Sequence, residues 1–485
     1  MVGIRSYGAY VPRYRLDRKK IFEAMGWLNS GTRGLARGEK AVANADEDNL
    51  TMAVAASIDC INGFDHSELG GVYFASTTFP FQERQNAGVI AGALGMKENI
   101  RSADFAGALK SGSTALISAF ESVASGGIRD LVVCSSDCRL GKLGSPQEMI
   151  FGDGAAAFLV SDQDVIAEYK GAYSITADFV DHYRGRFAKF DRQWEDRWIR
   201  DLGYEHMIPT VIEGILGKYD LKADDFAKVI YPCHYPPERK KLNKRLGIDP
   251  EKVQDILMDQ IGEMGSAQSL VMLAKSLEDA EPGDKILVVT YGSGCDALFF
   301  EVTEQIKSLP KRKGVSWHLA NRKELDRYEK YLTWRNIVPV DTGLRGEQDS
   351  PTRWSMIWRA NKAILGLCGS KCKKCGTPQF PPQRICVNPD CGAKDEMEDY
   401  YFSDKAGKVA SFTGDNLAAS NNPPQIYGNV LFEGGGKVMI NFTDCDVESL
   451  KVGMPTSFSF RIKYYDEIRD IVRYFWKAVP VMEEG

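Results

Sequence analysis

Apolar, β-branched runs alternate with segments of helical length from the start of the chain to about residue 305. The runs typical of strands are Gly71–Ala75, Asp130–Cys134, Ala155–Val160, Lys228–Tyr231, Lys285–Tyr291 and Ala297–Val302. The segments between them that predict helices include Asn49–Asn62, Ser111–Ser125, Tyr204–Tyr219 and Ala267–Leu277. Continuous apolar strands separated by helices predict an α/β fold whose sheets are buried on both faces.

Two of the segments that lead into strands resemble each other. Residues 151–160 read FGDGAAAFLV and residues 291–300 read YGSGCDALFF, so in each a turn of small residues precedes an apolar strand. An internally duplicated fold produces such an echo. Glycine-rich turns before strands are common, however, and the echo alone leaves duplication and coincidence equally open.

The pattern changes beyond residue 306. Charged residues gather between 307 and 330, few apolar residues occur between 341 and 353, and we predict helices, a connector and a domain boundary near 345. Short alternating or apolar runs separated by Gly, Asn and Asp turns then follow, at Gly407–Thr413, Asn429–Phe432, Lys437–Phe442 and Thr456–Arg461. These runs predict a small β-barrel.

Four cysteines in two close pairs carry the most specific chemical signal of the chain. Cys372 and Cys375 are separated by two residues, ten residues follow, and Cys386 and Cys391 are separated by four. Two thiolate pairs across a short loop predict a tetrahedral structural zinc site. A disulfide interpretation is weaker, because no secretory signal precedes the chain and its other cysteines are scattered. A four-thiolate site has no open position, so the zinc should stabilise a fold without activating water.

Length and composition narrow the possible classes of protein. The 485 residues exceed the roughly 250–300 at which a single core stops growing, so at least two folding units are expected. The net charge is −5 with both signs mixed along the chain, which argues against a nucleic-acid partner. No stretch approaches the roughly 18 apolar residues of a membrane span. Eleven cysteines without a targeting segment indicate the reducing cytoplasm.

An ordered set of motifs resembles the archaeal type of 3-hydroxy-3-methylglutaryl-CoA synthase, a family of the thiolase superfamily. The motifs are YGAYVPRYRL at 7–16, GEKAV at 38–42, DED at 46–48 with TMAV at 51–54, FGDGAAA at 151–157 and YGSG at 291–294. This resemblance covers residues 1–345. It implies a duplicated five-layered fold, a homodimer, and an acyl-CoA substrate bound in a tunnel between the two halves.

Residues 346–485 resemble the zinc-ribbon and OB-fold proteins that accompany thiolases. The resemblance implies a helical connector and a rubredoxin-like zinc ribbon at 346–400, followed by an OB-fold barrel at 401–485. Enzyme and accessory protein are then one polypeptide, and a further thiolase-like subunit remains an open possibility as a partner.

Two catalytic positions of the family carry other residues here. The family's nucleophile segment reads Cys-Lys-Ala-Gly-Thr-x-x-Leu, and the matching octet is LKSGSTAL at 109–116, with Leu109 at the cysteine position. A leucine side chain neither attacks nor titrates, and Ser111 lies about 200° away around a helix. The family's acid/base segment reads Gly-Ser-Glu-Ser-His-Pro, and Thr77 stands where the glutamate belongs. A hydroxyl transfers protons poorly near neutral pH.

Other positions keep polar groups. His234 matches the histidine that polarises the thioester in the family, whereas His66, His182, His206 and His318 are interpreted as structural or surface residues. Glu263 replaces an asparagine of the family's Gly-Asn-Thr segment. Beside His234 it would be a general base with a pKa raised by burial, or it merely pairs with a lysine.

Three further candidates follow from position along the chain. Tyr235 is the second candidate base. Cys295, after the turn at 292–294, is either a proton-transfer thiol or an inert buried cysteine. The basic run Arg239, Lys240 and Lys241 either meets the phosphates of coenzyme A or forms the solvated face of a helix.

Three functions are consistent with these residues. The first is aldol or retro-aldol chemistry on a β-hydroxyacyl-CoA, which needs a base and donors for an enolate oxygen but no acyl-enzyme. The second is an acyltransferase of the hydroxymethylglutaryl-CoA synthase type with an unrecognised nucleophile, for which Cys295 is the candidate. The third is a non-catalytic CoA-binding subunit that scaffolds an active thiolase.

Overall fold

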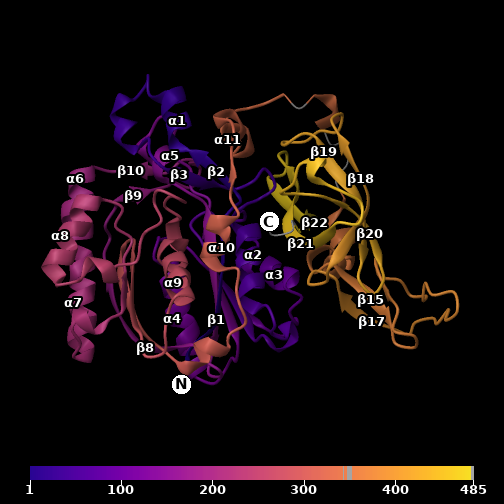
Figure 1. Cartoon of the computed structure of the whole chain (residues 1–485), viewed down its shortest axis with the longest axis horizontal. Coiled ribbons are helices and arrows are strands. Elements are labelled where there is room, and N and C mark those ends of the chain that lie inside the picture. The colour runs from indigo at the N-terminus through magenta and orange to yellow at the C-terminus, as the bar shows by residue number, and fades with distance from the viewer. Residues whose placement is uncertain (342, 347–351, 482–485) are drawn as a thin grey trace. The chain divides into compact units, whose positions relative to one another are not determined.

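The structure is a computed structural model that describes residues 1–341, 343–346 and 352–481. Within these ranges no helix combines the length and the apolar character needed to cross a membrane. The chain forms two compact units (Figure 1). The first holds residues 1–44, 48–88 and 97–331, and the second holds 45–47, 89–96 and the described residues from 332 on.

A nine-stranded mixed sheet forms the frame of the first unit. Its spatial order is β11 (Lys228–Ile230), β12 (Lys285–Tyr291), β13 (Gly294–Val302), β8 (Ala167–Thr176), β1 (Gly3–Tyr10), β7 (Gly154–Ser161), β6 (Leu131–Asp137), β4 (Gly71–Ala75) and β5 (Arg101–Phe105). The two halves of this sheet meet where β1 pairs with β8 at Gly3–Glu168 and Ile4–Ala167. This frame is the predicted α/β fold.

The two halves repeat one pairing scheme. In the first half β7 lies antiparallel between β1 and β6, and in the second β13 lies antiparallel between β8 and β12. The next strand outward is parallel in both halves, since β4 pairs with β6 and β11 pairs with β12. The segments 151–160 and 291–300 therefore hold equivalent places, and their echo reflects duplication.

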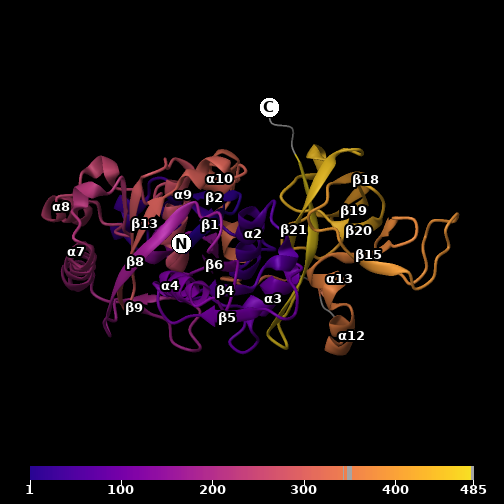
Figure 2. The ribbon, with the colours of Figure 1, turned by 90° about the horizontal axis from the view of Figure 1, so that it is seen from below.

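Helices complete five layers. α2 (Asn49–Ile61) packs on the first half-sheet, α7 (Ile208–Tyr219) packs on the second, and α4 (Ser111–Ala124) with α9 (Gln268–Glu278) shares a buried core with strands of both halves. Figures 1 and 2 show α7 and α8 (Pro236–Leu246) on the outer side of the second half. α4 and α9 approach closely at Gly112, where a Cβ would lie 2.8 Å from both the Leu270 side chain and the Ser266 carbonyl oxygen.

The chain up to residue 334 contains several shorter elements. The strands are β2 (Tyr14–Asp17), β3 (Glu39–Val42) and β14 (Lys323–Glu324) in one small sheet, and β9 (His182–Tyr183) and β10 (Arg192–Gln193) in another. The remaining helices up to residue 334 are α1 (Arg18–Met25), α3 (Asn86–Ala93), α5 (Pro146–Ile150), α6 (Asp196–Trp198), α10 (Gly314–Ala320) and α11 (Tyr328–Trp334).

The second unit contains a ribbon and a barrel-like sheet. After α12 (Trp354–Arg359) and α13 (Asn361–Leu365), the ribbon has the order β16 (Pro378–Gln379), β15 (Cys368–Cys372) and β17 (Met397–Tyr401). The second sheet has the order β20 (Lys437–Asn441), β19 (Gln425–Phe432), β18 (Gly407–Asp415), β21 (Pro455–Asp466) and β22 (Ile471–Pro480). A bridge between Phe442 and Ala478 brings its two edges together around a core that includes Phe460 and Trp476, so the predicted barrel is present.

The domain limits predicted from sequence, 1–345, 346–400 and 401–485, remain predictions. Residues 347–351 of the expected connector, and residues 482–485 at the end of the expected barrel, lie outside the described residues.

Candidate functional site

A cavity of about 60 Å³ opens at the N-terminal end of α4. Leu109 lines it, one residue before the N-cap Lys110. The turn at Gly292 closes over this point: its φ is +152°, and a Cβ there would lie 2.8 Å from the backbone nitrogen of Leu109. The polar side chains around the cavity include Arg139, Asp181, His182, Asp191, Tyr204, His234, Tyr235, Glu263 and Tyr291.

His234 follows β11 and is held among aromatic rings. The Tyr204 hydroxyl lies 3.4 Å from its Nδ1, and the Tyr235 ring centroid lies 4.1 Å from the imidazole centroid. Burial, together with the positive charge of Arg139, lowers the pKa of His234 from its ordinary 6.5 to about 4. The imidazole is therefore neutral near pH 7, and it can donate or accept a hydrogen bond without carrying charge.

Glu263 is tied into a buried ion pair. One of its carboxylate oxygens lies 2.6 Å from Nη1 of Arg139, and the other accepts the N–H of Gly265 at 2.9 Å. Arg139 also binds Asp191 at 2.7 Å and lies 4.0 Å from the Phe151 ring centroid. The partner of Glu263 is thus an arginine. The alternative to a role as general base had been an ion pair with a lysine.

Asp181 and His182 form an acid–base pair at the same cavity. Oδ1 of Asp181 lies 2.8 Å from Nδ1 of His182 and accepts the backbone N–H of His182 at 2.7 Å. Although burial acts to raise it, hydrogen bonds from His182 lower the pKa of the Asp181 carboxyl below its usual value. Sequence reasoning missed this pair, because a lone histidine is usually structural and His182 was interpreted in that way.

Tyr204 reaches the cavity from a segment of π-helix, η3 (Ile199–Met207). Its ring stacks on Tyr291 with centroids 4.6 Å apart, and burial raises the pKa of its hydroxyl well above the ordinary value. The π-helix is rare and is frequently found at functional sites. The sequence predicted an ordinary helix beginning at Tyr204, so this contributor was also missed.

Thr77 and Cys295 are not among the described residues that line the cavity. The Thr77 hydroxyl donates to the buried carboxylate of Asp137 at 3.0 Å, which gives it a structural hydrogen bond. Cys295 is fully buried in β13, and burial raises the pKa of its thiol above the ordinary value. A thiol in this setting stays protonated and is a weak nucleophile.

The basic run lies on α8, directly after His234 and Tyr235. The Arg239 guanidinium donates to the Gln254 carbonyl oxygen and lies 5.6 Å from the Tyr231 ring centroid. Lys240 is exposed, and the Lys241 ammonium lies 2.9 Å from Glu205. A role of these three side chains in CoA binding remains a prediction.

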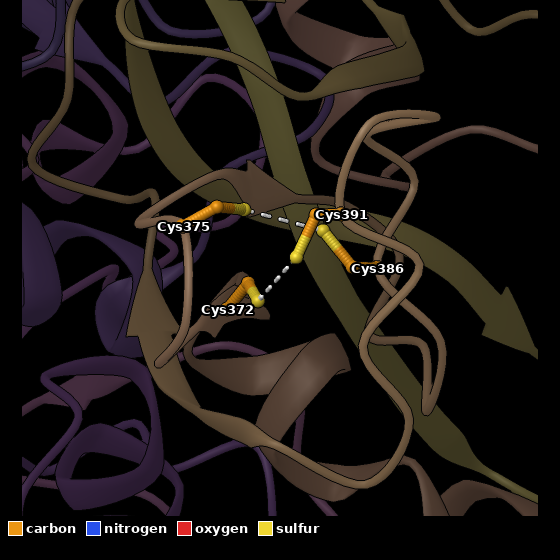
Figure 3. A group of neighbouring side chains, drawn as sticks. All are labelled: Cys372, Cys375, Cys386 and Cys391. Carbon is orange, nitrogen blue, oxygen red and sulfur yellow. Dashed lines mark hydrogen bonds between the residues drawn. The ribbon is translucent and has the colours of Figure 1, made fainter.

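Cys372, Cys375, Cys386 and Cys391 converge in the ribbon (Figure 3). All four sulfur atoms lie within 4.8 Å of one another, with 3.8 Å between Cys372 and Cys391 and 3.5 Å between Cys375 and Cys386. Four sulfurs at about 2.3 Å from one tetrahedral ion are separated by about 3.8 Å, so the donor set fits a thiolate-bound metal.

Comparisons with known families match both parts of the chain. Residues 366–398 match the rubredoxin-like zinc ribbon domain of ChsH2, which confirms the zinc ribbon that the resemblance implied. Residues 216–298 match the C-terminal part of 3-oxoacyl-[acyl-carrier-protein] synthase III.

Among curated proteins, the hydroxymethylglutaryl-CoA synthase of Methanopyrus kandleri is 34% identical over 319 residues, which are 64% of this chain and 90% of that protein. The same enzyme of Caldivirga maquilingensis is 32% identical over 350 residues, which are 70% of this chain and 99% of that protein. Among solved structures, an HMG-CoA synthase complexed with CoA superimposes with a TM-score of 0.63 at 22% identity, covering 73% of this chain and 94% of the other.

Proposed function

The chain belongs to the hydroxymethylglutaryl-CoA synthase family, and we propose that it makes or breaks a carbon–carbon bond in an acyl-CoA without forming an acyl-enzyme. The reaction we favour is aldol or retro-aldol chemistry on a β-hydroxyacyl-CoA. In the cleavage direction, a base takes the β-hydroxyl proton, the bond between Cα and Cβ breaks, and the electron pair passes to the enolate of the departing thioester.

The observation that carries this proposal is the lining of the cavity at Leu109. Among the described residues that line it there is no cysteine. The hydroxyls of Ser266, Ser269 and Thr290 are hydrogen-bonded within the protein, to Ser135, to the Val289 carbonyl and to Ser113. A covalent acyl intermediate needs an activated nucleophile within reach of the thioester carbonyl, and aldol chemistry does not.

His234 supplies the donor for the thioester oxygen in this proposal. A Tyr204 hydroxyl that donates to Nδ1 places the imidazole proton on Nε2, which then donates to the carbonyl oxygen and to the enolate. The low pKa of His234 keeps this donor neutral. Removing one such donor typically costs about 10²–10³ in kcat.

The second candidate function is condensation by acyl transfer, and family membership favours it. Cys295 is the candidate nucleophile for this acyl-transfer hypothesis. Its complete burial speaks against attack on a thioester unless the surrounding strands open.

Intact-protein and product mass spectrometry distinguishes these functions. The purified full chain is incubated with a panel of β-hydroxyacyl-CoAs and β-ketoacyl-CoAs, beside His234→Ala and, as a matched control, His206→Ala, which changes an exposed histidine on η3. We expect a free aldehyde or ketone, a shorter acyl-CoA and no mass shift of the protein. A stable acyl adduct contradicts the proposal in favour of acyl transfer, and CoA binding without turnover favours a non-catalytic subunit.

A further inference from the structure

The Asp181–His182 pair is placed at the cavity by a hairpin that also carries the cavity residues Asp191 and Gln193. His182 begins β9, and its register partner on β10 is Gln193. The backbone N–H of Trp194 donates to the Asp181 carbonyl at 2.9 Å, which fixes the residue before the histidine. Asp181 and His182 therefore face the cavity from a side that neither β11 nor α4 supplies.

The pairing sets the proton on the imidazole. An ionised Asp181 accepts from Nδ1–H, so in the neutral ring the lone pair lies on Nε2. The side chain of His182 is 22% exposed and that of Asp181 is 9% exposed, so the carboxylate is covered while the ring remains reachable. A reachable imidazole with a buried carboxylate behind it is the arrangement by which proteins hold a histidine base in one tautomer.

The other candidate bases at the cavity are already engaged. Both carboxylate oxygens of Glu263 have partners, in Arg139 and in the Gly265 N–H. The Tyr235 hydroxyl donates to Asp196 at 3.2 Å, and burial raises its pKa. His234 takes up a second proton only below about pH 4, so at neutral pH it is a weak proton acceptor.

We propose that His182 is the general base of this site and that Asp181 is its positioning residue; the inference rests on the proposed aldol chemistry. Nε2 takes the proton of the substrate β-hydroxyl as the bond between Cα and Cβ breaks and the carbonyl product forms. The imidazolium then returns that proton to Cα of the thioester enolate, which releases the shorter acyl-CoA. Atoms and electrons balance with no further reactant.

Turnover and chemical rescue test the base role. We expect His182→Ala to lower kcat by about 10²–10⁴ while CoA still binds, and free imidazole to restore at least tenfold of the loss. His182→Gln, which keeps the size of the side chain, should show the same loss with no room for rescue. Asp181→Asn should lower kcat without a gain from imidazole, and His206→Ala should behave as the wild type.

Two results overturn the inference in an enzyme that cleaves the panel substrates. One is turnover of His182→Ala within a few-fold of wild type. The other is a loss that imidazole does not restore in protein that still binds CoA, because a positioning or structural role of His182 predicts that rescue fails.

Failure of the proposed cleavage reaction is detected separately. If the wild type cleaves no substrate, exchange of the Cα hydrogens of propionyl-CoA for deuterium measures proton transfer by the base without cleavage of a carbon–carbon bond. Exchange by the wild type that falls at least tenfold in His182→Ala supports the inference, and absence of exchange in the wild type overturns it.

Discussion

At the scale of single residues, Leu109 and His234 set the character of the cavity. Leu109 places an inert side chain where covalent chemistry would need a nucleophile. The cavity that Leu109 lines has a volume of only about 60 Å³. Leu109 is therefore a determinant of what fits. Uptake of a second proton by His234 decides whether the cavity presents a neutral hydrogen-bond donor or a cation.

Replacing Leu109 tests whether it only fills space. Leu109→Ala should widen the cavity and shift the preference toward longer or branched acyl chains while turnover persists. Leu109→Cys should give a thiol at a helix N-terminus that iodoacetamide alkylates readily. It should not by itself create a synthase, because Thr77 supplies no carboxylate. If Leu109→Ala abolished turnover as completely as His234→Ala, with CoA binding intact, the space-filling role and the aldol assignment would both be withdrawn.

His234 should make stability depend on pH in a defined direction. Its pKa is about 4 in the folded protein and about 6.5 when unfolded, so between these values the unfolded state binds more protons. This contribution is fully present above pH 6.5 and is lost as the pH falls toward 4, up to about 3 kcal/mol. Denaturant unfolding of wild type and His234→Gln at several pH values measures it. A difference between the two proteins that stays constant from pH 7 to pH 4.5 would contradict the assignment.

At the scale of elements, the site depends on a close approach between a turn and a helix end. Gly292 precedes β13, and the space for its Cβ is taken by the backbone of Leu109 just before α4. Gly152 lies at the equivalent turn of the first half, and a Cβ there would lie 2.0 Å from the Ile261 carbonyl oxygen. Both duplicated turns therefore pack closely against loops that carry site residues.

Gly292→Ala should displace the start of α4 and lower both stability and turnover. Gly283→Ala is the matched control, since its φ is also positive, at +92°, but nothing lies within 4 Å of the added Cβ. We expect the control to lose about 1 kcal/mol from backbone strain, and Gly292→Ala to lose clearly more because of the added overlap. Equal losses in urea unfolding would show that the approach to Leu109 carries no energetic weight.

In the nine-stranded sheet, the strands with continuous apolar runs were predicted from the sequence, and strands without such a run, including β8 and β5, were missed. β4, β7 and β12 are continuous apolar runs, whereas β8 is half-exposed along its length and β5 is short and polar at its start. Leu109, His234, Glu263 and Tyr235 were expected at one site by resemblance and line one cavity. His182 was missed because its placement depends on pairing with Gln193, and the π-helical turn of η3 was missed because side-chain periodicity does not distinguish it from an α-helix.

At the scale of the whole molecule, the chain joins a synthase-like body to a ribbon and barrel. The superfamily resemblance predicts a homodimer through the body, because an isologous interface is the usual closed solution. Sedimentation of the full chain at micromolar concentration should give twice the chain mass of 53.9 kDa. A single species at the chain mass would contradict the predicted dimer.

The metal should act on the second unit as a folding element. We expect one zinc per chain held by Cys372, Cys375, Cys386 and Cys391, since four thiolates leave no position for a reactive water. Because such sites form only when the chain folds, the binding free energy of the ion becomes stability of the ribbon. Cys372→Ser should therefore remove the zinc and the thermal transition of the second unit while the transition of the first persists.

Cys445→Ser changes a half-buried cysteine of the same unit outside this cluster and should keep both the metal and the transition. Elemental analysis of wild-type protein without stoichiometric zinc, or a Cys372→Ser variant that retains both transitions, would show that the ribbon folds without a metal.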